Sequence, residues 1–125
     1  MPARDVAAFE LSKLMGVLSH PQRLRIVEEL QHGEVDVNTL SERLGTSHSR
    51  VSQHLGLLRS HRLVIERREG RHVYYHLAQP KLARWVMAGL EFLESELASS
   101  AARKEVLKEA RTLWTTSAKT KKRAR

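Results

Sequence analysis

The side chains best suited to chemistry lie in one short polar stretch near the middle of the chain. The stretch has no acidic residue before Leu55. Its polar members are Ser47, His48, Ser49, Arg50, Ser52, Gln53 and His54. Short hydroxyl side chains let a helix backbone approach the base edges of nucleic acid, where amide and guanidinium groups then form hydrogen bonds. Because a helix that merely faces water usually includes glutamate, this stretch favours a helix that reads base edges.

Catalytic and metal chemistry have little support in the sequence. Cysteine is absent, which excludes disulfides, thiolate zinc sites, iron–sulfur ligation and thiol-based redox sensing. We find no Ser–His–Asp order, no carboxylate pair in an apolar setting and no glycine-rich phosphate loop, so we expect neither an enzyme nor a cofactor. His72 and His76 are four residues apart on a predicted strand, about 13 Å, which is too far for one metal ion. His48 and His54 do not share a helix face.

The positive charge of the chain is concentrated in two segments. The 125 residues include 22 Lys and Arg against 14 Asp and Glu, a net charge of +8. Residues 1–42 are acidic overall, whereas residues 43–72 contain seven arginines and two acidic residues, and residues 117–125 add five basic residues. Such a distribution favours a polyanionic partner, nucleic acid before an anionic membrane.

Nothing in the sequence predicts a membrane segment. No apolar run approaches the roughly 20 residues of a membrane span. The first ten residues also lack the apolar core of a signal peptide. We therefore expect a soluble cytoplasmic protein that has no membrane partner.

Two helices are predicted in the first third of the chain. Apolar residues recur at three- and four-residue steps over residues 5–18, which indicates an amphipathic helix. Ser19 is suited to cap a second helix that has Pro21 in its first turn and ends at Gly33.

The polar stretch belongs to a predicted pair of short helices over residues 38–60. Asn38 is expected to cap the first of these helices, which closes at Gly45, and Thr46 or Ser47 to cap the second. Two helices joined by a short glycine turn form a helix-turn-helix. The second helix buries its apolar side and exposes the polar stretch.

A β-hairpin is predicted directly after the helix-turn-helix. Residues 63–78 hold two runs rich in β-branched and aromatic residues, separated by a turn at Gly70. Placed there, the hairpin is a wing. The predicted fold class is therefore mainly α: an α+β winged helix with a helix-turn-helix and a two-stranded wing, flanked by further helices.

Helical patterns continue beyond the wing. Pro80 opens a long helix with an apolar stripe up to Leu97, and Ser99 and Ser100 break it. A last helix is predicted over residues 103–115. Residues 117–125 are too polar to fold alone and are predicted to form a basic disordered tail, or alternatively a nonspecific DNA tether.

Four sequence strings in this order carry a family resemblance. They are HPQRLRI at residues 20–26, LSERLG at residues 40–45, VSQHL at residues 51–55 and RREGRHVYY at residues 67–75. With these strings the chain resembles the ArsR/SmtB family of bacterial winged helix-turn-helix transcriptional regulators over about three-quarters of its length. The resemblance implies an ArsR-type domain over residues 5–97 that binds double-stranded DNA.

The resemblance also implies an assembly and a mode of action. Family members are homodimers joined through the first helix and the helix after the wing. They repress transcription by binding an inverted-repeat operator, and an effector releases them. We expect residues 98–116 to support the dimer and the protein to lie in the bacterial cytoplasm, associated with the nucleoid.

Ten residues match the family's DNA-binding positions. They are Ser47, His48, Ser49, Arg50, Ser52, Gln53, His54, Arg67, Arg68 and Arg71. His54 either contacts the DNA backbone or packs inside the domain. Arg67 and Arg68 either contact DNA or are solvated on the strand, whereas Arg71 at the wing tip is placed to enter the minor groove.

Two residues depart from the family pattern. Gly56 stands where the family usually has a polar residue, which removes one possible backbone contact. Arg62 stands where the family usually has glycine before the wing. Because glycine suits a left-handed helix cap, Arg62 either strains that cap or ends the helix differently.

The effector is not evident from the sequence. Metal-sensing relatives carry Cys near the third helix, or Asp and His along the helix after the wing. Residues 34–37 have no sulfur, and residues 81–97 have glutamates but no histidine. An organic effector, a protein partner or no effector is therefore expected. Two alternatives stay open: a metal-responsive repressor that uses His and carboxylate ligands, for example His32 or Asp36 across subunits, and a nonspecific DNA-coating protein.

Overall fold

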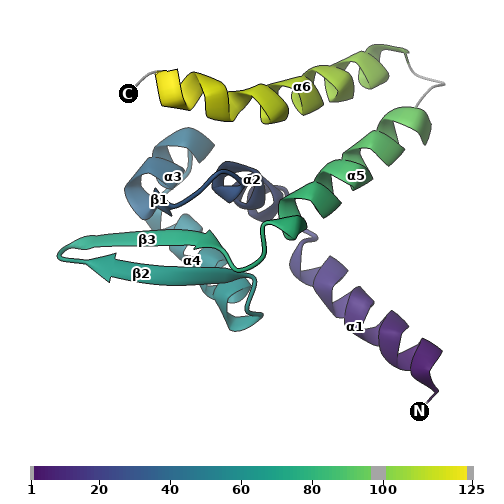
Figure 1. The fold of residues 1–125 in the computed structure, drawn as a ribbon, viewed down its shortest axis with the longest axis horizontal. Coiled ribbons are helices and arrows are strands. Elements are labelled where there is room, and N and C mark those ends of the chain that lie inside the picture. The colour runs from purple at the N-terminus through teal and green to yellow at the C-terminus, as the bar shows by residue number, and fades with distance from the viewer. Residues whose placement is uncertain (1, 97–100, 124–125) are drawn as a thin grey trace. The chain divides into compact units, whose positions relative to one another are not determined.

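The computed structural model describes the backbone of residues 2–96 and 101–123, and the side chains of these residues up to residue 115 (Figure 1). It divides into two compact units, Met1–Gln79 and Pro80–Arg125, which are described separately. The first unit contains α1 (Ala3–Val17), α2 (Pro21–Leu30), β1 (Val35–Asp36), α3 (Val37–Leu44), α4 (His48–Ser60), β2 (Val64–Glu69) and β3 (His72–Leu77). The second unit contains α5 (Lys81–Glu96) and α6 (Ala101–Arg123).

The first unit has the predicted winged helix-turn-helix fold. Helices α3 and α4 are joined by a short turn, and β2 and β3 form an antiparallel hairpin directly after them (Figure 1). The short strand β1 pairs with β3 on its other side, so the sheet has the order β1-β3-β2. Gly70 adopts a φ of +60° at the turn of the hairpin, which a glycine tolerates without steric cost. The wing is thus continuous with the start of α3, because Asp36 pairs with Tyr74.

The core of this unit lies among α2, α3, α4 and the sheet. Its fully buried side chains are aliphatic: Ile26, Val27, Leu30, Leu40, Val51, Leu55, Leu58 and Val64. Those in α4 recur at three- and four-residue spacing, which puts them on one face and leaves the polar stretch on the other. Hydrophobic burial therefore determines which side of α4 faces water.

Two helix caps differ from the prediction. The N-cap of α2 is His20, not Ser19, and its Nδ1 accepts a hydrogen bond from the backbone N–H of Gln22 at 3.0 Å. The residue before a proline is extended, so with Pro21 at the first helical position only His20 is placed to cap. The N-cap of α3 is Asp36, not Asn38, because the extended backbone of β1 ends there and the Asp36 carboxylate accepts the N–H of Thr39. For α4 the cap is Ser47, one of the two predicted candidates, the other being Thr46.

The two ends of the helix-turn-helix use the same C-terminal motif. At the end of α3, Gly45 has a φ of +63°, and Thr46 N–H donates to Ser41 O at 3.2 Å. At the end of α4, Arg62 has a φ of +60°, and Leu63 N–H donates to Leu58 O at 2.9 Å. Helix α4 therefore ends in a left-handed cap in which an arginine, not the glycine usual in the family, is strained. Of the two predicted alternatives, a strained cap or a different helix end, the structure has the first.

We expect Arg62→Gly to stabilise the protein. Glycine removes the steric cost of the left-handed conformation, about 1–2 kcal/mol. Part of this gain in stability is offset because glycine also gives the unfolded chain more conformational freedom. The free energy of unfolding should rise by about 1 kcal/mol, measured by urea denaturation. Arg62→Ala is the matched control, because it removes the side chain but keeps the strain. An equal gain in both variants would contradict the explanation.

In the second unit, α5 and α6 are packed together. The Arg111 Nε donates to both carboxylate oxygens of Glu94 at 3.0 Å. Helix α6 continues to Arg123, so residues 117–123 are helical where disorder was predicted, and the last two residues of that predicted tail lie outside the described residues. Residues 101–123 contain no Gly or Pro and are rich in Ala, Lys and Arg, which favour helix even without burial. The predicted break at Ser99 and Ser100 lies outside the described residues. None of the described helices is both long and apolar enough to cross a membrane.

Candidate nucleic-acid interface

The polar stretch forms an exposed surface along the first half of α4. Ser47, His48, Ser49, Arg50, Ser52 and Gln53 are all exposed. Val51, between them in sequence, is fully buried with Leu55. The surface therefore presents hydroxyl, imidazole, guanidinium and amide groups on a helix that is anchored from behind.

Local hydrogen bonds hold the start of α4. The Ser47 hydroxyl accepts the backbone N–H of Arg50 at 3.1 Å and so caps the helix. In the turn before it, the Ser41 hydroxyl donates to Thr46 O at 2.6 Å. The first bond holds the start of α4, and the second connects α3 to the turn that precedes α4.

His54 differs from the other predicted contacts because it is half-buried. Its ring lies 4.4 Å from that of His20, centroid to centroid, and its Nδ1 is 3.4 Å from an Arg23 guanidinium nitrogen. Burial lowers the pKa of His54, and the charges of His20, Arg23 and Arg50 lower it further. These contacts match the packing alternative, since they engage the ring within the domain.

We expect His54 to make stability depend on pH between about 7.5 and 5.5. Because its pKa is lower in the folded protein than in the unfolded chain, the unfolded state binds more protons in this range. The contribution of His54 to stability is therefore complete above its pKa in the unfolded chain. It is lost as the pH falls from that pKa through its lower pKa in the folded protein. The carboxylates with lowered pKa, Glu34, Asp36 and Glu66, lose their contribution only at more acidic pH.

Urea denaturation at the two pH values measures this effect. The fall in the midpoint should be smaller in His54→Gln than in the unchanged protein. His61→Gln, which replaces an exposed histidine at the end of the same helix, should retain the full fall. Equal falls in all three proteins would show that His54 is not responsible.

Arg67 on β2 is held by contacts within the chain. Its guanidinium donates to both oxygens of Glu34, at 2.6–3.1 Å, and to Glu69 at 2.7 Å. It also lies over the ring of Tyr74, 4.7 Å from the centroid. The hydrogen bonds to Glu34 and Glu69 raise the pKa of Arg67, and the bond from Arg67 lowers the pKa of Glu34. Arg67 thus connects the segment before β1 to the wing.

Glu66 is a functional candidate that the sequence reasoning missed. Its largely buried carboxylate accepts hydrogen bonds from Arg68 at 2.6 Å and from the Tyr75 hydroxyl at 3.0 Å, and it pairs with Arg59. Hydrogen bonding by Arg68 is the largest cause of its lowered pKa. Arg59 lies in the last turn of α4, the second or recognition helix of the helix-turn-helix, so Glu66 joins this helix to the wing. The available signal was that Glu66 is one of only two acidic residues among the seven arginines of residues 43–72.

Two of the predicted arginines differ from Arg67 and Arg68. In the part of the chain that the structure describes, Arg50 and Arg71 have no ion pair with an acidic side chain. Arg50 lies on the exposed face of α4, and Arg71 lies at the turn of the wing. These two guanidinium groups are therefore available to a polyanion.

Over residues 2–96 and 101–123, no three His, Cys, Asp or Glu side chains are grouped to hold a metal ion.

Comparison with known proteins agrees with this geometry. The model of the arsR family of bacterial regulatory proteins matches residues 20–66. The biofilm growth-associated repressor of Agrobacterium fabrum is 38% identical over 88 residues, which are 70% of this chain and 75% of that protein. The crystal structure of the transcriptional repressor BigR from Xylella fastidiosa has a TM-score of 0.62 and 33% identity, with 74% of this chain and 92% of that chain covered.

A further solved structure has the same architecture. It is the homodimeric winged helix-turn-helix DNA-binding domain of a possible ArsR-family regulator from Mycobacterium bovis. Its TM-score is 0.67 at 26% identity, with 81% of this chain and 94% of that chain covered. Fold, matched segment and coverage agree, and the chain belongs to the arsR family of bacterial regulatory proteins.

Proposed function

We propose that the protein is a homodimeric transcriptional repressor that binds an inverted-repeat operator and is released by an effector. The observation that carries this proposal is the exposed, acid-free face of α4, supported from behind by Val51 and Leu55. Such a face fits the major groove, where serine, glutamine and arginine side chains meet base edges. The relatives from Agrobacterium and Xylella, both named repressors, support repression.

The proposed DNA contacts fall into two groups. Ser49, Arg50, Ser52 and Gln53 are assigned to base edges or phosphates of the major groove, with Ser47 and His48 at the start of the helix. Arg71 is assigned to the flanking minor groove. We assign Arg67, Arg68 and His54 secondary roles at the DNA, because their side chains are already engaged within the chain.

Exposed apolar residues support a dimer. Val6, Phe9, Leu11 and Met15 on α1 are exposed, and so are Trp85, Phe92 and Leu93 on α5. Large exposed apolar groups on one helix indicate a protein interface. The Mycobacterium bovis relative is homodimeric. A symmetric dimer places its recognition helices about one helical turn of DNA apart, roughly 10 base pairs.

The experiment that tests the proposal is a fluorescence-anisotropy titration at about 150 mM salt. DNA from upstream of the protein's own gene is compared with a scrambled duplex of equal length and composition. A preference of about a thousandfold or more supports a specific regulator. If both duplexes bind equally, selection from a random pool follows. Failure to enrich any sequence would favour a nonspecific DNA-coating protein.

The helix α6 is proposed to support the dimer. Val106 on α6 is exposed, and the ion pair of Arg111 with Glu94 holds the helix to α5. A chain truncated at Ser99 should dissociate at a concentration where the full chain is dimeric, as measured by sedimentation. A truncated chain that remains fully dimeric at low micromolar concentration would disprove this role. We also propose a cytoplasmic, nucleoid-associated location, because a repressor bound to its operator lies on the bacterial chromosome.

A further inference from the structure

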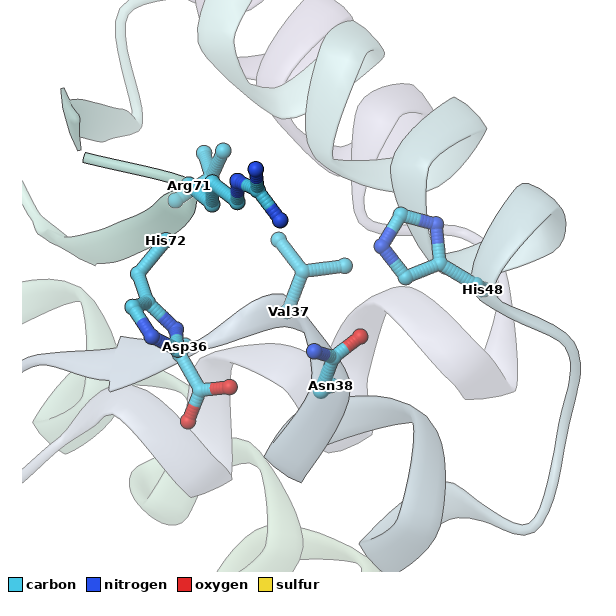
Figure 2. Close-up of a pocket in the computed structure, with 7 residues that line it drawn as sticks. Asp36, Val37, Asn38, His48, Arg71 and His72 are labelled. Carbon is cyan, nitrogen blue, oxygen red and sulfur yellow. The ribbon is translucent and has the colours of Figure 1, made fainter. Parts of the chain in front are cut away.

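A small, open polar hollow lies where the wing, α3 and α4 meet. Asp36, Val37 and Asn38 line it from the start of α3, His48 from the first turn of α4, and Arg71 and His72 from the wing. In Figure 2 the Arg71 guanidinium, the His48 ring and the Asn38 amide surround the side chain of Val37. Three elements thus bring hydrogen-bond donors to one place.

The chemistry of this hollow favours an anion. Guanidinium, amide and imidazole groups all donate, and an imidazole has an N–H in either protonation state. The acidic residue in the lining is Asp36, and its carboxylate is engaged with the N–H and hydroxyl of Thr39 at the cap of α3. The Asp36 carboxylate also points away from Arg71 in Figure 2. The first residues of α3 and α4 line the hollow, so the positive ends of two helix dipoles add to the field.

The size and position of the hollow narrow the choice of anion. Pockets for organic ligands are usually deep and mainly apolar, whereas this hollow is small, open and polar. His48 begins the helix assigned to the major groove, and Arg71 is the residue assigned to the minor groove. A DNA strand that passes from one groove to the other carries a phosphodiester between them.

We propose that the hollow binds one backbone phosphate of the operator, with Asn38, His48 and Arg71 as its donors. This inference rests on the proposed function, since it requires the operator complex. It adds Asn38 to the DNA-contacting residues and gives the wing tip and the recognition helix a shared ligand. Correct docking of α4 and of the wing would then depend on the same phosphate.

Asn38→Asp is a sharp probe of this site. Asn38 is exposed in the first turn of α3. An acidic residue there interacts favourably with the positive end of the helix dipole, so the variant should fold. In the complex the new charge would face the phosphate. We expect the operator affinity to fall by about tenfold or more, since a charge-assisted hydrogen bond is replaced by repulsion.

Single methylphosphonate substitutions along the operator locate the contact. A methylphosphonate removes the charge of one phosphate. At one methylphosphonate position in each half-site, Asn38→Asp and Arg71→Ala should no longer weaken operator binding by their usual factors. Arg50 does not line the hollow, so Arg50→Ala should weaken binding by its full factor at that position. If the loss caused by Asn38→Asp is the same at every position, or if there is no loss, the phosphate site is disproved.

Two further outcomes separate this proposal from its alternatives. If the protein binds its operator selectively but no methylphosphonate position removes the effect of Asn38→Asp, the phosphate site alone is overturned. If the protein shows no selective binding at all, the proposed function is overturned as well. Inorganic phosphate is titrated into DNA-free protein at constant ionic strength and followed by the NMR signals of His48 and His72. We expect only weak, unsaturated shifts. Saturation in the low millimolar range without methylphosphonate coupling would assign the hollow to a free anion instead.

Discussion

Replacing Leu55 by alanine is expected to lower the free energy of unfolding by about 2–5 kcal/mol, the range for a leucine removed from a core. Leu55 is fully buried in the middle of α4, in the core that holds the recognition helix. The change removes its packing and leaves a cavity that the surrounding side chains fill only in part. Because domains of this size are stable by only about 5–15 kcal/mol, a large share of the stability would be lost.

Leu57→Ala is the matched control for this prediction. Leu57 lies on the same helix and is 37% exposed, so its loss should cost much less. Urea denaturation followed by circular dichroism measures both variants. DNA affinity measured well below the denaturation midpoint should change little in either, because neither side chain belongs to the exposed polar face. Equal destabilisation by the two changes would contradict the assignment of the core.

Replacing Arg50 by alanine is expected to weaken operator binding by about 1–3 kcal/mol, roughly 5- to 150-fold, if the guanidinium reads a base. Arg50 is exposed on the polar face of α4, and no acidic side chain competes for it among the described residues. Its backbone N–H is bonded to Ser47, so the helix start should persist after the substitution. Anisotropy titration with operator and scrambled duplexes measures the change.

The pattern of loss shows what Arg50 contacts. Loss on the operator alone indicates a base contact, whereas equal loss on both duplexes with a shallower salt dependence indicates a phosphate. Arg50→Lys keeps the charge without the planar fork, so it should retain binding to the scrambled duplex but not the full preference for the operator. Unchanged affinity for both duplexes in Arg50→Ala would remove Arg50 from the interface.

Most elements of the fold could be predicted because their signals are local. The spacing of Val51, Leu55 and Leu58 predicts which face of α4 is buried, and all three are buried. Gly45 and Gly70 predict the two turns, and both adopt positive φ. Errors occurred at the ends of helices, where neighbouring residues compete. His20 caps α2 because Pro21 follows it, and Asp36 caps α3 because strand pairing extends to it.

The state of the arginines could not be predicted in the same way. Arg67, Arg68 and Arg71 are close in sequence and of one type. However, Arg67 pairs with Glu34, 33 residues away, Arg68 pairs with Glu66, and Arg71 lines a hollow with Asn38 and His48. Hydrogen bonds and ion pairs depend on distances in space, and the sequence gives only distances along the chain.

The sequence by itself thus determined the order of the elements, the polar face of α4 and the family. These follow from periodicity, turn residues and motif order, which operate within a few residues of one another. Only the tertiary structure decided which arginines are held in ion pairs, that His54 packs on His20, and that three elements line one polar hollow. Each of these depends on residues from separate elements meeting, and that is decided by how the apolar core packs.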